Sequence, residues 1–181
     1  MSAVAKCRRA YRFQLGPVVS YSTCMEATWE LKVAAEVAFA MLLGGLIGIE
    51  REAAHKPAGF RTHMLVSGSA ALLVGLGHAL VIEFGQHATL RLQSDPIRIV
   101  EAIVTGVSFL GAGTIFRAKG EHIEGLTTAA SLLMCAALGV CVAVERFILA
   151  GTVTVLALLV LRGARSIERR IGQKSRSEPT P

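Results

Sequence analysis

The sequence predicts an all-α integral membrane protein with five transmembrane helices. The 181 residues are 52% hydrophobic and only 18% charged, and the mean hydropathy is +0.54. Soluble domains have about 25% charged residues. The apolar residues also form five long runs without the period-two alternation of membrane β-barrels, which favours helices. The composition excludes a disordered chain, and four scattered cysteines are too few for a secreted disulfide scaffold.

The five runs define the expected spans, because a hydrocarbon core about 30 Å thick needs roughly 20 helical residues. Four runs are long enough, whereas the fifth is short and must recruit Gly163 and Ala164, with Arg162 reaching to the headgroups. The membrane domain is expected at residues 25–164, followed by a basic cytoplasmic tail at 165–181. The expected spans are Leu31–Ile49, Met64–Phe84, Ile99–Phe116, Leu126–Val144 and Phe147–Leu161, the last extended to residue 164.

Basic residues predict the orientation of these spans. The side with loops 50–63 and 117–125 and the C-terminal tail carries eleven Lys and Arg, and the other side carries eight. Because Lys and Arg accumulate in cytoplasmic loops, we expect a cytoplasmic C-terminus and an external N-terminus. Residues 1–24 form an N-terminal extension that is a poor signal peptide. We expect translation to begin at Met25, which widens the difference to eleven against four.

A shift of 66 residues aligns the first helical hairpin with the second. The identities suggest a parallel repeat of helices 1–2 and 3–4 about an axis normal to the membrane; the alternative is a coincidence of biased composition. The eight identical pairs are Gly45/Gly111, Ile49/Ile115, Arg51/Arg117, Gly59/Gly125, Thr62/Thr128, Ala70/Ala136, Ala71/Ala137 and Leu72/Leu138.

Small residues at helical spacing predict close helix packing. Gly44 and Gly48 form a G-x-x-x-G on the first span, which packs inside the bundle or, alternatively, forms a homodimer. The Val- and Leu-rich fifth span is expected to lie outside a bundle of the first four, facing lipid. The other expected packing positions are Ser67, Ala71, Gly75 and Ala79 on the second span, Ser108, Gly111, Ala112 and Gly113 on the third, and Ser131, Cys135 and Gly139 on the fourth.

The inner ends of the spans carry a dense set of polar residues. We expect Thr62 and Thr127 to act as helix N-caps. We also expect a Glu50–Arg61 ion pair to hold the first loop. The alternative is that these are interfacial charges that follow the positive-inside rule. The complete set is Glu50, Arg51, Arg61, Thr62, Arg117, Thr127 and Thr128.

Two carboxylates are the candidate metal ligands. Glu36 and Glu101 lie near the outer ends of spans one and three, and Mg²⁺ prefers oxygen ligands. The alternative is that both face the headgroups or pair with Lys32 and Arg98. No other cofactor is expected, since the histidines and cysteines lack zinc spacing. The basic tail suits anionic lipid headgroups better than nucleic acid.

Four ordered motifs closely resemble the MgtC/SapB family of bacterial membrane proteins: Leu43–Glu52, Ala58–Val66, Gly106–Ile115 with Arg117, and Gly125–Ala130. The resemblance covers about Met25 to Gly163 and agrees with a start near Met25. Two positions depart from the family pattern, with Ser108 in place of the usual Gly and Leu133 in place of a frequent Trp. The soluble C-terminal domain that MgtC carries is not expected here, because only a short basic tail follows Leu161.

The resemblance implies a multi-pass protein of the bacterial inner membrane, linked to magnesium homeostasis and adaptation to low magnesium. We expect a non-enzymatic regulator that contacts the bilayer and another membrane complex such as ATP synthase, a partner that the resemblance implies. The alternative is a transporter or channel for Mg²⁺ or another ion. A membrane enzyme ranks third, since no nucleophile–base set is evident from the sequence.

Overall fold

A computed structural model describes residues 17–85, 96–117 and 123–175, with side chains for 27–82, 96–115 and 124–163. The chain divides into two compact units, residues 1–35 and 36–181. In the first unit the described residues are helical, and most of the described side chains are exposed. The second unit contains the rest of that helix and all the other elements described here.

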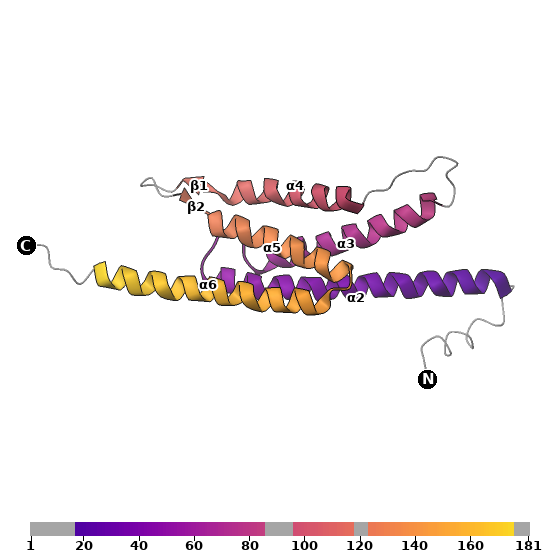
Figure 1. Cartoon of the computed structure of the whole chain (residues 1–181), viewed down its shortest axis with the longest axis horizontal. Coiled ribbons are helices and arrows are strands. Elements are labelled where there is room, and N and C mark those ends of the chain that lie inside the picture. The colour runs from indigo at the N-terminus through magenta and orange to yellow at the C-terminus, as the bar shows by residue number, and fades with distance from the viewer. Residues whose placement is uncertain (1–16, 86–95, 118–122, 176–181) are drawn as a thin grey trace, which may run out of the picture. The chain divides into compact units, whose positions relative to one another are not determined.

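Five helices and one short antiparallel β-ribbon make up the described residues (Figure 1). The ribbon pairs Phe116 with Glu124 and Arg117 with Ile123. Phe116 was expected to end the third span as part of a helix, and no strand was predicted for the loop 117–125. The elements are α2 (Pro17–Ala53), α3 (Phe60–Gly85), α4 (Pro96–Thr114), β1 (Phe116–Arg117), β2 (Ile123–Glu124), α5 (Leu126–Ala143) and α6 (Phe147–Ser175). The predicted helical fold class is therefore confirmed.

Four of the described helices are long and apolar enough to cross a membrane. They cover Ala27–Ala53, Phe60–Ile82, Pro96–Thr114 and Leu126–Ala143, with mean hydropathy between 1.4 and 2.0. Each coincides with one of the first four expected spans. The apolar part of α6, Phe147–Gly163, is shorter, so the fifth span remains a prediction.

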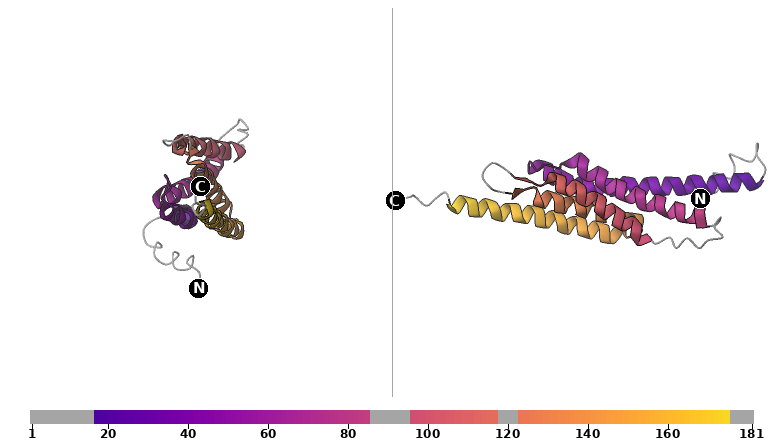
Figure 2. Two further views of the ribbon diagram at one scale, coloured as in Figure 1. Left: turned by 90° about the vertical axis from the view of Figure 1, so that its left-hand side faces the viewer. Right: turned by 90° about the horizontal axis from the view of Figure 1, so that it is seen from above.

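Within the second unit, α5 is the central helix and packs on α3, α4 and α6 (Figure 2). The predicted small-residue stripes of α3 and α5 face each other. A methyl group on Gly139 would be 2.9 Å from the Ala70 Cβ and 3.0 Å from the Ala71 backbone nitrogen. These residues therefore allow the close backbone approach that helix association in lipid requires.

The G-x-x-x-G of α2 packs on α3 within the same chain. A methyl group on Gly44 would lie 2.5 Å from the His63 carbonyl oxygen, and one on Gly48 would lie 2.7 Å from the Phe60 Cα. The face is therefore occupied and cannot also form a homodimer. On α4, Gly111 packs 3.2 Å from the Ala129 Cβ by the same measure, as predicted, whereas Gly113 faces open space among the described residues.

Both α4 and α6 are largely exposed in the described side chains of the second unit. Only Ile103, Val107 and Gly111 of α4 are buried, and the predicted packing residues Ser108 and Ala112 are exposed. On α6, the buried residues among the described side chains are Ala150 and Thr154. These two smaller side chains are four residues apart and pack on the bundle. They were not selected from the sequence, because most residues of the helix are Val and Leu.

Residues paired by the predicted repeat occupy equivalent positions at the starts of two helices, but they differ in backbone conformation and in burial. Gly59 and Gly125 each directly precede a helix, α3 and α5 respectively. Gly125 has a φ of 94°, whereas Gly59 has a negative φ. Ala71 is buried but its counterpart Ala137 is exposed. The repeat remains a prediction.

We predict that Gly44→Leu destabilises the protein strongly, because the new side chain would collide with the α3 backbone rather than with a movable side chain. Overpacking typically costs about 1–3 kcal/mol, and a collision with backbone atoms should place this variant at the upper end of that range. Gly151→Leu on α6 is the matched control, because a methyl group there meets no atom within 4 Å. Thermal unfolding in detergent should show a much lower midpoint for Gly44→Leu alone; equal midpoints would contradict the packing.

Candidate functional site: a buried polar cluster

Six polar side chains are buried where the C-terminal end of α2 meets the first turns of α3 and α5. We call them the buried polar cluster. None is more than 5% exposed, which is unusual because charged groups are rarely enclosed without a partner. Its members are Glu50, Arg51, His63, Ser67, Thr128 and Ser131.

Glu50 and Arg51 form an ion pair between adjacent residues of α2. Arg51 Nε and Nη2 each lie 2.6 Å from Glu50 Oε2. Both charges lie close enough to act electrostatically on His63. Because such a pair is desolvated, removing one partner leaves an uncompensated charge in the interior. The pair is therefore important for folding even if its formation contributes little net stability.

His63 joins α3 to α5 through hydrogen bonds at both ring nitrogens. Nδ1 lies 2.8 Å from the Gly59 carbonyl oxygen, and since a carbonyl only accepts, Nδ1 carries the proton and donates it. Nε2 lies 2.9 Å from Ser131 Oγ on α5. The Ser131 hydroxyl also lies 2.8 Å from the Thr128 carbonyl oxygen, so its single proton is shared between that carbonyl and His63 Nε2, both of which accept. The chain of contacts thus runs from the start of α3 into the first turns of α5.

The Ser131–His63 contact has the distance of a nucleophile and its general base. However, His63 is 0% exposed and Ser131 is 5% exposed, so a substrate has no access to the hydroxyl in this conformation. The two residues are 68 positions apart. Nothing in the local sequence signals their contact, and the sequence analysis did not identify it.

Three oxygen atoms of the cluster have no hydrogen-bond partner within the part of the chain that the structure describes. They are Glu50 Oε1, Ser67 Oγ and Thr128 Oγ1. A buried unpaired polar group costs about 1–3 kcal/mol. The cluster therefore contains more hydrogen-bonding atoms than the contacts between its helices use.

The N-terminus of α3 is capped by a side chain that the sequence analysis did not select. Glu52 Oε2 accepts a hydrogen bond of 2.9 Å from the Phe60 backbone nitrogen. A carboxylate at this position also interacts favourably with the helix dipole. Glu52 therefore closes the loop between α2 and α3.

The predicted threonine N-caps are wrong. Thr62 lies inside the first turn of α3 and Thr127 is the second residue of α5, and both are exposed. The N-cap of α5 is Gly125, in the left-handed conformation and without a side-chain cap. A side chain at Gly125 would collide with the Thr114 carbonyl oxygen, which explains why glycine occupies the position.

The predicted Glu50–Arg61 ion pair is also wrong, because Glu50 binds Arg51 and Arg61 is exposed. The exposed Arg61 does not pair with the buried carboxylate, whose second oxygen, Oε1, has no hydrogen-bond partner among the described residues. Arg117 is in β1, and its side chain lies outside the described ones.

The two candidate metal ligands do not come together within the chain. Glu36 of α2 is 8% exposed, whereas Glu101 of α4 is exposed. Their helices lie on different sides of α5 in the second unit (Figures 1 and 2). Within the described ranges, no group of three or more His, Cys, Asp or Glu side chains is placed to hold a metal ion.

The apolar helices and the enclosed charges together define a multi-pass helical membrane protein. A model of the MgtC family matches residues 37–170, a segment that includes the whole buried polar cluster. The chain belongs to the MgtC family.

Three relatives show the extent of the similarity. The protein is 44% identical over 107 residues to "Protein MgtC" of Brucella abortus, which covers 59% of this chain and 40% of that protein. It is 37% identical over 134 residues to the Escherichia coli K12 protein named "Putative magnesium transporter YhiD", with coverage of 72% and 60%. It is 36% identical over 104 residues to "Protein SapB" of Bacillus subtilis, with coverage of 58% and 44%.

The chain thus spans between 40% and 60% of the length of these relatives. No solved structure matches it.

We predict that Arg51→Ala destabilises the protein by about 3–5 kcal/mol, because it leaves Glu50 buried and unpaired. Arg61→Ala is the control and should leave stability essentially unchanged, since Arg61 is exposed. Thermal unfolding in detergent measures both. A strong loss with Arg61→Ala and none with Arg51→Ala would favour the pairing expected from the sequence.

We predict that Ser131→Ala costs about 1–3 kcal/mol, because it leaves His63 Nε2 buried without its partner. Ser69→Ala is the control, since the Ser69 hydroxyl bonds only the Val66 carbonyl of its own helix and the residue is exposed. Denaturation of the two variants in the same detergent should separate them. Equal stability would show that the His63–Ser131 contact does not hold α3 and α5 together.

Proposed function

We propose that the protein is a non-enzymatic regulator of the bacterial inner membrane, linked to magnesium homeostasis, which acts by contact with another membrane protein. The observation that carries this proposal is the location of the buried charge. Glu50 and Arg51 neutralise each other inside the bundle. His63 and Ser131 join helices rather than facing an open site. These polar residues hold a fixed core, which suits a protein that presents surfaces to a partner.

The proposed topology has five spans, with α6 as the fifth. Its apolar part is short, but Arg162 is exposed at its end and can extend to the headgroups. In this arrangement the buried polar cluster lies near the cytoplasmic side, where the basic residues accumulate. A cytoplasmic or membrane-embedded complex such as ATP synthase would meet the protein from this side.

A second candidate function is transport of Mg²⁺ or another ion. One relative is named as a magnesium transporter in the words quoted above. Glu36 supports this alternative, because ionisable residues buried inside membrane spans often mark ion pathways. The separation of Glu36 from Glu101 weighs against a site made by these two side chains within one chain.

Flux measurements distinguish the two functions. The protein is reconstituted into liposomes that contain a Mg²⁺ indicator, beside empty liposomes and a Glu36→Gln/Glu101→Gln variant. A regulator should give no Mg²⁺ entry above that of empty liposomes, because the Glu50–Arg51 ion pair and the His63–Ser131 contact hold helices together rather than lining an ion path. Thermal unfolding of the same preparation shows whether the protein is folded.

Saturable Mg²⁺ entry that the double variant abolishes would overturn the regulator proposal and assign the two glutamates to the ion path. Without flux, the proposal requires an effect on other membrane machinery. ATP-driven proton pumping in inverted membrane vesicles should then fall when the protein is present, and should be retained when the destabilised Arg51→Ala variant replaces it.

A further inference from the structure

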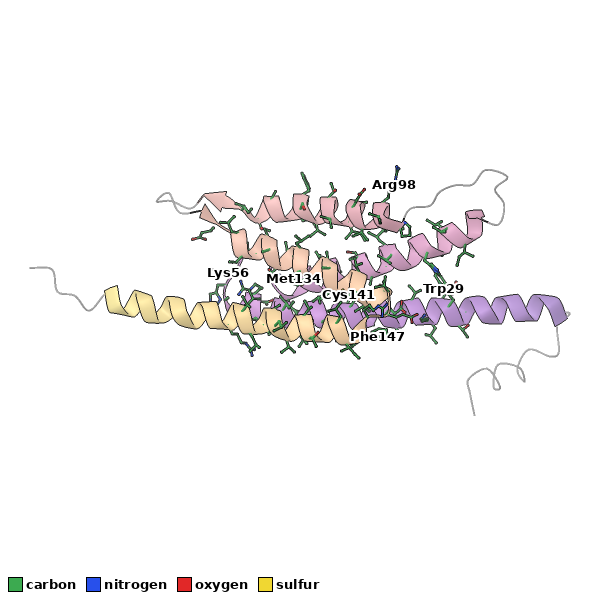
Figure 3. The ribbon with its side chains drawn as sticks, viewed as in Figure 1. Trp29, Lys56, Arg98, Met134, Cys141 and Phe147 are labelled. Atoms are coloured by element: carbon green, nitrogen blue, oxygen red, sulfur yellow. The ribbon has the colours of Figure 1, made fainter. Side chains whose placement is uncertain are left out.

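The face of α4 that points away from the bundle carries charged and polar residues. The buried side chains of α4 are on one face. Five exposed residues, spaced by three or four positions, share the opposite face, which we call the outer face of α4. Figure 3 shows Arg98 on this face, pointing away from α6. The outer face consists of Arg98, Glu101, Thr105, Phe109 and Ala112, all of them exposed.

Contact with lipid alone would be energetically unfavourable for the outer face of α4. Charged side chains within membrane spans are costly and almost always face protein or water. Elsewhere in the spans, Glu36, Glu50 and Arg51 are buried. Arg98 and Glu101 are exposed, and their span, Pro96–Thr114, has only 19 residues, so it has no excess length beyond the hydrocarbon core. The other exposed charges, Glu30, Lys32, Glu52 and Arg61, lie at the ends of longer spans of 27 and 23 residues. The outer face therefore fits a protein partner that supplies compensating charge.

The charges of the outer face are complementary to those of a second copy. Arg98 and Glu101 are about one helical turn apart, which is a rise of roughly 4.5 Å. When two copies are related by a two-fold axis normal to the membrane, their α4 helices run in the same direction. When a residue of one copy contacts a different residue of the other, the symmetry repeats the same contact with the two copies exchanged. Arg98 of one copy would meet Glu101 of the partner subunit, and the same ion pair would form a second time.

The shape of the helix also suits this arrangement. Phe109 is 81% exposed, the most exposed aromatic side chain among the described residues. It is flanked on α4 by Gly106 and Gly113, and a methyl group at either glycine would meet no atom within 4 Å. A large ring beside two positions without side chains can pack against a parallel neighbour at short distance.

We propose that the protein forms a homodimer in the membrane through the outer face of α4, held by two reciprocal Arg98–Glu101 ion pairs and by Phe109. This interface differs from the Gly44/Gly48 face, which α3 occupies. The inference does not depend on whether the protein is a regulator or a transporter.

Cysteine cross-linking in intact bacterial membranes locates the interface. The four native cysteines are replaced by Ala in the full chain, and Thr105→Cys is introduced on the outer face. Ile148→Cys on α6 is the control, because Ile148 is 85% exposed but on another helix. Since a disulfide needs Cα atoms within about 7 Å, oxidation should give at least about tenfold more dimer with Thr105→Cys. Equal yields at the two positions would overturn the proposal.

Charge reversal tests the ion pairs in the same cross-linking background. Arg98→Glu and Glu101→Arg each place like charges across the interface and should lower the dimer yield about tenfold. The double variant Arg98→Glu/Glu101→Arg recreates opposite charges and should restore the yield. Restoration also shows that the single variants lost association rather than folding. A double variant that dimerises no better than the single ones would overturn the ion-pair interface.

Discussion

The close approach of α3 to α2 on one side and to α5 on the other is the constraint on which the rest of the second unit depends. Gly44 brings α2 against the α3 backbone, and Gly139 does the same for α5. In lipid there is no hydrophobic driving force between apolar helices, so close packing and internal polar contacts must hold them together. At this separation His63 can reach Ser131, and the Glu50–Arg51 pair is enclosed. A single bulky side chain at either glycine would separate the helices and expose these groups to lipid.

Features that depend on a few neighbouring residues could be predicted from the sequence. The length of an apolar run determines whether a helix can cross a bilayer, so the first four spans were found within a few residues. A glycine four positions from another lets two backbones approach, which identified Gly44 and Gly48. The MgtC family was also recognisable, because its motifs are short and continuous in the sequence.

Features that depend on which helices become neighbours could not be predicted. His63 and Ser131 are far apart in sequence, and the family motif that contains His63 does not indicate which helix its side chain meets. Glu50 was expected to bind Arg61 across a loop, but it binds the adjacent Arg51 instead. A pair within one helix does not require the loop to be held in a fixed conformation. The cap of α3 comes from Glu52 on the preceding helix rather than from Thr62. The composition of α6 indicated a lipid-facing helix, although the position of Ala150 and Thr154 shows that a few smaller side chains decide which face packs.

Charged side chains within the spans are either enclosed between helices or exposed on a helix surface. The enclosed charges mark a region of fixed packing, and the exposed ones mark a surface that can adapt to a neighbour. Where α2, α3 and α5 meet, opposite charges are enclosed and neutralise each other, so this region cannot rearrange without exposing an unpaired charge. On α4 the charges face outward, and only three residues hold the helix in the core. The energy of these outward charges depends on what lies beside them. A protein that contributes to regulation by contact needs such a surface, because a partner can change the stability of α4 without disturbing the buried cluster.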